Sequence, residues 1–89
     1  MSNENYQNKL VLIKEASMSK LYRDEKHRFF FCVDGFGCHP ELRGSAIFGF
    51  HLSDGERVRW ERSDIEKIVE ITPDFQKRID EVKIWLEGK

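Results

Sequence analysis

Two segments with alternating apolar and polar residues flank a short turn in the second half of the chain. SAIFGFHL occupies residues 45–52, ERVRWER occupies residues 56–62, and Ser53-Asp54-Gly55 separates them. A period of two is typical of a strand with one buried face. Asp-Gly between two such runs is a strong hairpin signal. The sequence therefore predicts a β-hairpin, and the sheet has to be built around it.

The length of the turn decides which side chains of the hairpin share a face. A two-residue loop sets the aromatic residues of the first strand opposite arginines. A three-residue loop instead pairs Phe50 with Val58 and Phe48 with Trp60, which collects apolar side chains on one face. Ser-Asp-Gly also suits a type I turn followed by a glycine in the left-handed region. We therefore expect a three-residue loop, with Phe48 and Phe50 inside.

Two more segments are predicted to be strands. Lys9–Glu15 is apolar on both faces, which is typical of a central or covered strand. His27–Val33 is rich in aromatic and β-branched residues, which favour pleated structure. Residues 16–26 between them are polar and are expected to form a loop with one helical turn. Asp34–Gly44 contains three glycines and a proline, so it is predicted to be a long loop.

The chain after the hairpin carries two helix-start signals. Ser63 followed by Glu66 matches a capping box, which predicts a short helical turn. Thr72, with Pro73 behind it, is typical of the start of a longer helix. Gly88 is a plausible end for that helix. Four apolar residues follow Pro73 at helical spacing and form one stripe: Phe75, Ile79, Val82 and Leu86.

These elements together predict a mainly β domain of the α+β class. We expect a small, bent antiparallel sheet or an SH3-like barrel of about four to five strands, with the last helix closing one side. Residues 56–66, a strand ending in a helical turn, resemble the end of SH3-like barrels in shape alone. The 89 residues fit one domain, which we place at residues 9–89. The polar segment 1–8 is expected to be disordered.

The composition excludes several classes of protein. The chain has 15 Lys and Arg against 16 Asp and Glu, a net charge of −1, which argues against nucleic-acid binding by bulk electrostatics alone. No apolar run approaches the roughly 20 residues that span a bilayer. The first residues lack the apolar stretch of a signal peptide. We therefore expect a cytoplasmic protein with no membrane partner. Two cysteines are too few for a disulfide scaffold.

Cys32, Cys38 and His39 are the residues most typical of a metal or thiol site. Paired zinc ligands are usually separated by two to four residues, whereas five residues separate the two cysteines and no second pair exists. Cys38 and His39 are adjacent, and adjacent side chains of an extended loop point apart. We therefore predict no metal, no cofactor and no catalytic residue. A metal- or thiol-dependent site at Cys38 and His39 stays as an alternative.

A nucleic-acid-binding surface is a second alternative. Gly35-Phe36-Gly37 and Phe48-Gly49-Phe50 resemble the glycine–aromatic alternation of sheets whose rings stack on bases. Residues 9–62 contain 10 Lys and Arg against 8 Asp and Glu, so the predicted strand region is mildly basic. The match is incomplete, because Asp34 precedes the first glycine and Cys38 stands where an aromatic residue is expected. The alternative function is therefore binding of single-stranded RNA or DNA.

Protein binding is the function that the pattern favours. A glycine in mid-strand, such as Gly49, often marks a bend or the close approach of another backbone. The predicted register sets Gly49 opposite Arg59 and His51 opposite Arg57 on the outer face. The candidate contact residues lie on that face and in the 34–44 loop: they are Phe36, His39, Arg43, Gly49, His51, Arg57 and Arg59. The arginines would supply charge pairs and Phe36 an apolar anchor.

Several short motifs carry a further resemblance: they are Gly35-Phe36-Gly37-Cys38, Gly44, Phe48-Gly49, Asp54-Gly55-Glu56, Arg59-Trp60-Glu61 and Asp64-Ile65-Glu66. Over about residues 11–66 the chain resembles small uncharacterised proteins of bacterial conjugative elements and phages. No activity comes with this resemblance. It implies a mobile-element accessory protein, and such proteins often bind and block a host protein, for example a restriction or CRISPR component. We therefore expect a non-catalytic protein-binding module whose partner is another protein. A monomer or a small homo-oligomer fits this expectation.

Overall fold

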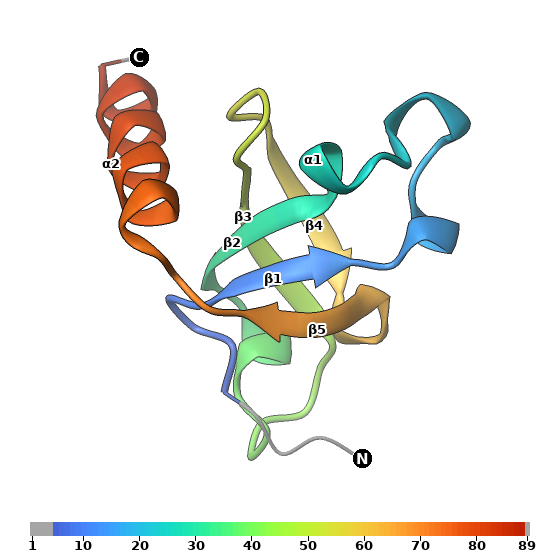
Figure 1. Ribbon diagram of the computed structural model, residues 1–89. Coiled ribbons are helices and arrows are strands. Elements are labelled where there is room, and N and C mark those ends of the chain that lie inside the picture. Colours follow the sequence, from blue (N-terminus) through green and yellow to red (C-terminus); the bar gives the residue numbers. More distant parts are fainter. Residues whose placement is uncertain (1–4, 89) are drawn as a thin grey trace.

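Residues 5–88 are described by a computed structural model, in which five antiparallel strands form one sheet (Figure 1). The order of the strands across the sheet is β4-β3-β2-β1-β5. The strands are β1 (Leu10–Ile13), β2 (Phe29–Asp34), β3 (Ala46–His51), β4 (Arg57–Glu61) and β5 (Ile65–Val69). The helices are α1 (Glu25–Arg28) and α2 (Pro73–Glu87), and the 3-10 turns are η1 (Glu15–Ser17), η2 (Lys20–Tyr22), η3 (Phe36–Cys38) and η4 (Arg62–Asp64). The expected α+β class is confirmed, with an antiparallel sheet that stays open rather than closing into a barrel.

The sheet is bent, so its two edge strands come close at one end. β4 and β5 lie at opposite ends of the strand order, and the single turn η4 joins them (Figure 1). Pairing shifts by one residue between Leu12 and Ile13 and again between Cys32 and Asp34. Such bulges bend a strand and increase its twist. β1 lies between two neighbours and is buried along its whole length, as its apolar sequence predicts.

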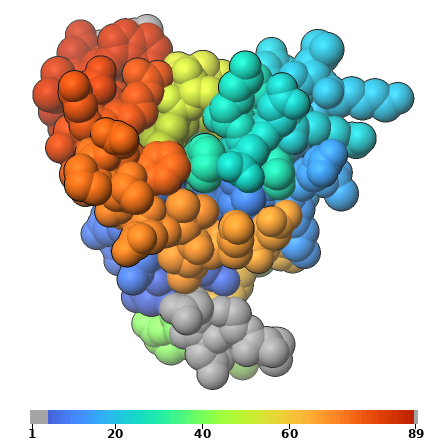
Figure 2. All heavy atoms as spheres, viewed as in Figure 1, coloured from blue at the N-terminus to red at the C-terminus, as the bar shows by residue number. Residues whose placement is uncertain are grey.

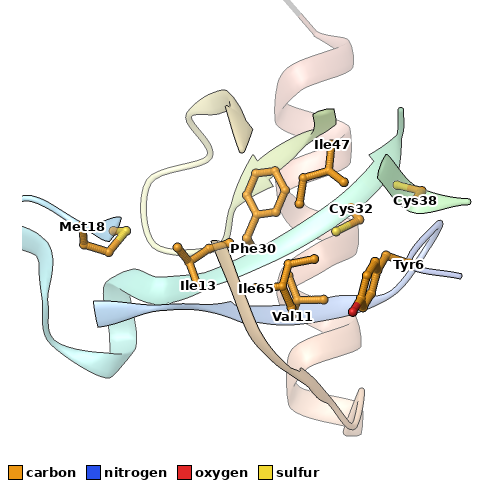
Figure 3. Packing of buried hydrophobic residues seen from close by; sticks show 9 residues of the cluster. All are labelled: Tyr6, Val11, Ile13, Met18, Phe30, Cys32, Cys38, Ile47 and Ile65. Atoms are coloured by element: carbon orange, nitrogen blue, oxygen red, sulfur yellow. The ribbon is translucent and has the colours of Figure 1, made fainter. Parts of the chain in front are cut away.

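Apolar side chains cover both faces of the sheet. On the concave face, Val11, Phe30 and Ile47 come from three adjacent strands and pack with Cys32 and Cys38 (Figure 3). The opposite face carries a second cluster, formed by strand residues and by the apolar stripe of α2: Leu10, Phe31, Phe50, Leu52, Ile79 and Val82. A sheet with two covered faces needs apolar residues at successive positions, which explains the runs in β1 and β2.

The helix α2 packs on its own domain (Figure 2). The Thr72 side chain caps it by accepting a hydrogen bond from the Phe75 N–H at 3.3 Å, and Gly88 ends it, both as predicted. Arg78 Nε donates to the carbonyl oxygen of Leu52 at 2.7 Å, which ties the helix to the β3–β4 connection. A Cβ at Gly55 would lie 2.7 Å from the Trp85 ring, so a glycine is needed beneath that indole. Within residues 5–88, no helix has the length and apolar character that crossing a bilayer requires.

The register of the β3–β4 hairpin differs from the prediction by one residue. Phe48 lies opposite Arg59 and Ile47 opposite Trp60. The His51 N–H donates to the Glu56 carbonyl, so the connection contains four residues rather than three. The prediction assumed one buried face on each strand. Because α2 covers the second face, the sheet can bury residues of both parities, and the shifted register places Ile47 and Trp60 together in the concave core.

Two further predictions after the hairpin are corrected. The capping box uses Glu61 and Asp64 rather than Ser63 and Glu66: the Glu61 N–H donates to Asp64 Oδ2 at 2.9 Å. The turn it caps is a single 3-10 turn, because the chain enters β5 immediately afterwards. β5 was not predicted as a separate strand. It pairs with β1, and that pairing draws a short charged segment into the sheet.

The prediction that the N-terminal segment is disordered is wrong for residues 6–8. Tyr6 is buried in the concave core, and its N–H donates to the Cys38 carbonyl at 2.8 Å. The Asn8 N–H donates to the Cys32 carbonyl at 2.8 Å. Residues 6–8 therefore belong to the folded domain and are held by β2 and η3. The first four residues of that predicted tail lie outside the described part of the chain.

Candidate functional site

An open groove of about 720 Å³ lies between the C-terminal half of α2 and the outer sides of β3 and β4. Phe48, Gly49 and Phe50 of β3 contribute to its lining. Lys83 and Glu87 of α2 line one side, and Arg57 and Arg59 of β4 line another. The helix covers the part of this face near Phe31 and Phe50, and leaves the part near β4 open.

The groove contains two apolar side chains that the fold leaves partly uncovered. Phe48 is 46% exposed and Val33 is 41% exposed. Val33 lies at the irregularity in β2, where Cys32 pairs with Gly49 and Asp34 pairs with Phe48. The extra residue lets both Val33 and Asp34 line the groove. Bulges that redirect side chains in this way are often found beside functional sites.

The charges around the groove are mostly positive. Arg57, Arg59 and Lys83 supply three cations, against the carboxylates of Asp34 and Glu87. Arg59 forms an ion pair with Glu61 at 2.7 Å. The Lys83 ammonium lies 4.8 Å from the centre of the Phe31 ring. The Arg57 side chain has no hydrogen bond or ion pair with any residue that the structure describes. An apolar floor with a cationic rim is suited to a ligand that is apolar in part and acidic in part.

The structure brings together only some of the predicted contact residues. Arg57, Arg59 and Gly49 line the groove. Phe36, His39 and Arg43 lie instead in the connection between β2 and β3, outside that lining. Phe36 is exposed there, as an apolar anchor has to be. The His39 ring lies 3.3 Å from the Asn5 amide and 3.9 Å from a Glu41 carboxylate oxygen, and Arg43 is exposed.

Gly49 is a glycine because of its own sheet. A Cβ at this position would overlap the carbonyl oxygen of Phe31 on the neighbouring strand β2. Of the two interpretations of this glycine, a bend or the close approach of another backbone, the structure shows the second, and that backbone belongs to the same chain. Gly49 also sits opposite Val58 rather than Arg59. It therefore shapes the groove as a flat position in its lining and offers no side chain for contact.

His51 is not a surface residue. It is 6% exposed, and it packs edge-on against the rings of Phe30 and Trp60. Its Nε2 accepts a hydrogen bond from Trp60 Nε1 at 3.0 Å, and its Nδ1 lies 3.1 Å from the Phe29 carbonyl oxygen. Burial lowers the pKa of the imidazole. The predicted position of His51 on the outer face is wrong, because the one-residue shift in register turns its side chain into the core.

The two cysteines are core residues of the concave cluster (Figure 3). Both are free thiols with no exposed surface, and burial raises the pKa of each. Cys32 and Cys38 belong to the same buried cluster. His39 is partly exposed, whereas Cys38 is packed inside. Among the described residues, no three His, Cys, Asp or Glu side chains are grouped as metal ligands.

The sequence alone did not identify Phe48, Val33 and Lys83 as groove residues. The alternation of β3 is compatible with either face for Phe48, so only the register could decide. Val33 depends on a bulge that leaves no mark in the sequence. Lys83 is brought to the site by the docking of α2. The alternating Arg-Val-Arg-Trp pattern of β4 was the one signal that could identify this region, and it did so for Arg57 and Arg59.

No known protein family, curated protein or solved structure matches this chain. The function is therefore inferred from the residues of the groove and of the strands that frame it.

Proposed function

We propose that this chain is a non-catalytic protein-binding module whose contact surface is the groove between α2 and the outer sides of β3 and β4. The observation that carries the proposal is the partial exposure of Phe48 and Val33 between cations of β4 and α2. Exposed apolar residues rimmed by polar ones mark interaction sites. A partly apolar centre with charged surroundings is also the usual anatomy of a protein interface.

The groove residues suit contact with a protein better than chemistry on a small molecule. Arginine and phenylalanine are enriched at protein interfaces, and arginine is among the residues that dominate binding energy. Arg57 is available for a new carboxylate, because it has no side-chain partner among residues 5–88. Arg59 already contacts Glu61, but both side chains are partly solvated, so exchange of that carboxylate for another costs little.

The identity of the partner follows only from the resemblance to proteins of conjugative elements and phages. That resemblance makes a host protein the expected partner and inhibition by occupation of a surface the expected effect. A small domain that covers a functional surface of another protein needs no catalytic residue. A protein that regulates its partner without inhibiting it would use the same groove contacts.

Single-stranded RNA or DNA is the second candidate ligand, and one observation favours it. Phe48 is on the surface beside Arg59 rather than in the core, where the predicted register placed it. An exposed ring beside cations is what proteins use to stack a base and hold its phosphate. Asp34 and Glu87 line the same groove and oppose a polyanion. We therefore rank protein binding first.

A pull-down from a lysate of the source organism, with and without nuclease, separates these two candidates. The wild-type chain is compared with Arg59→Glu and with Lys67→Glu, which carries the same change of charge on β5. The proposal predicts a protein that nuclease does not release, that Lys67→Glu retains and that Arg59→Glu loses. If the partners disappear with nuclease and the binding weakens steeply as salt rises, the ligand is a nucleic acid and not a protein. Capture of the same proteins by all three chains would contradict both.

A further inference from the structure

β4 is the last strand on its side of the sheet, and the pairing pattern shows which of its backbone groups face outward. The His51 N–H donates to the Glu56 carbonyl, and the Arg62 N–H donates to the Ser45 carbonyl. Hydrogen-bonded positions alternate in an antiparallel pair, so Val58 and Trp60 are the residues of β4 that bond to β3. Arg57 precedes Val58, and Arg59 lies between Val58 and Trp60. The backbone N–H and C=O groups of these two arginines therefore point away from the sheet.

Those outward groups belong to Arg57 and Arg59. The next outward N–H along the strand, that of Glu61, is already used, because it donates to Asp64 Oδ2 at 2.9 Å. The free edge of β4 is thus short and has a defined end. Within residues 5–88, no strand pairs with this edge. An edge of this kind is a template for strand addition.

The side chains of β4 differ sharply between its two faces. Arg57 and Arg59 are exposed on the groove face. Val58 and Trp60 pack against the concave core and are only partly buried, and no described strand continues the sheet beyond them. A strand that paired with β4 would place every second side chain next to the two arginines, and the remaining side chains next to Val58 and Trp60. It would need carboxylates on one face and apolar side chains on the other.

We propose that the edge of β4 binds an extended segment of another protein as a sixth strand, in which acidic and apolar residues alternate. This inference rests on the proposed function and specifies how its partner is held. The backbone of Arg57 and Arg59 supplies the ladder hydrogen bonds. Their guanidinium groups pair with the carboxylates of the segment. The apolar residues of the segment cover the exposed sides of Val58 and Trp60.

A second copy of this chain fits the edge poorly. If two β4 strands paired antiparallel about Arg57, Val58 or Arg59, an arginine would face an arginine, and like charges directly opposite each other destabilise a strand pair. The other edge strand, β5, lacks this pattern, because Glu66 and Lys67 are adjacent there and so place a carboxylate on one face and an ammonium on the other. The charge pattern therefore favours an acidic partner strand at β4.

Amide hydrogen exchange with a defined peptide tests this inference. The probe is an acetylated and amidated peptide of alternating Glu and Val, about six residues long to match a typical strand. A peptide with Lys in place of Glu and a peptide with the same residues in two blocks serve as controls. In the free protein, the amides of Arg57 and Arg59 should exchange much faster than those of Val58 and Trp60. The alternating acidic peptide should slow both arginine amides by about tenfold or more at saturation, and neither control peptide should.

Two charge-reversal variants test whether the acidic peptide binds at β4. Arg57→Glu should weaken binding of the acidic peptide by about tenfold or more, because an attraction on the strand face becomes a repulsion. Lys67→Glu, with the same change of charge on β5, should bind like the wild type. Slow exchange at Arg57 and Arg59 in the free protein, or no protection by the alternating peptide, would overturn strand addition. A natural partner that is lost in Phe48→Asp but leaves these two amides unprotected would keep the proposed function and remove only this inference.

Discussion

The indole Nε1–H of Trp60 donates a hydrogen bond to Nε2 of His51 at 3.0 Å. Because Nε2 accepts, the neutral ring carries its proton on Nδ1 and donates it to the Phe29 carbonyl oxygen at 3.1 Å. One imidazole therefore links β4, β3 and the start of β2 inside the fold. Protonation of Nε2 would break the bond from Trp60 and place a charge in the core.

This arrangement predicts that the domain loses stability in mild acid. Burial lowers the pKa of His51 below its ordinary 6.5, so the unfolded chain binds a proton at a pH where the folded chain does not. Stability is therefore fully present above pH 6.5 and falls as the pH drops from there toward the folded pKa. Urea denaturation at a series of pH values measures this. His51→Gln should remove the part of the slope in that window, and an unchanged slope in the variant would contradict the assignment.

The position of α2 predicts losses of different size for two phenylalanines on the same face of β3. Phe50 is 3% exposed and packs against α2, so Phe50→Ala should lower the free energy of unfolding by about 3–5 kcal/mol. Phe48 is on the surface, and Phe48→Ala should cost about 1 kcal/mol or less. Chemical denaturation of both variants measures the difference. Equal losses would indicate that both rings are buried, as in the register predicted from the sequence.

Gly49 should tolerate no side chain. A Cβ there would overlap the Phe31 carbonyl oxygen and lie 3.0 Å from the Phe30 ring, so strands β2 and β3 would have to separate. We expect Gly49→Ala to destabilise the domain by at least about 1–3 kcal/mol, the usual cost of overpacking. Gly88→Ala is the matched control, because its nearest neighbour lies at 3.5 Å and its φ is −74°. Similar melting temperatures for the two variants would argue against the close pairing.

Asp64 rather than Glu66 should stabilise the turn between β4 and β5. Asp64 accepts from the Glu61 N–H at 2.9 Å and from the Ser17 hydroxyl at 2.7 Å. Asp64→Ala should therefore cost about 0.5–2 kcal/mol, the usual range for capping side chains. Glu66 makes a 3.5 Å contact with Arg28 and is partly exposed, so Glu66→Ala should have a much smaller effect. A larger loss in Glu66→Ala would restore the capping box predicted from the sequence.

Local signals in the sequence predicted the elements whose causes are local. Thr72 and Pro73 start α2, and the stripe from Phe75 to Leu86 faces the sheet. β1 is apolar on both faces and lies inside the sheet, between β2 and β5. The register of the hairpin was not predictable in this way. It depends on α2, which covers the second face and makes Phe50 a core residue while Phe48 is not.

The residues of the candidate site were likewise predictable only where the signal is local in the sequence. Arg57 and Arg59 were identified because alternation along β4 is visible in the sequence. His51 was misplaced because the register moved by one residue, and each such step exchanges the two faces of a strand. Phe48 and Val33 emerged only from the register and from the bulge near Asp34. Lys83 reached the groove through packing between elements far apart in the chain.

The most direct measurement is a nuclear magnetic resonance titration of the labelled chain with the partner protein captured in the pull-down. The proposed function predicts that the largest changes fall on Phe48, Arg57 and Arg59, that Phe48→Asp abolishes them, and that Lys67 on β5 is unaffected. Changes centred on Phe36 and Arg43 in the β2–β3 connection, or on the exposed Ile84 of α2, with the β4 signals unmoved, would contradict it.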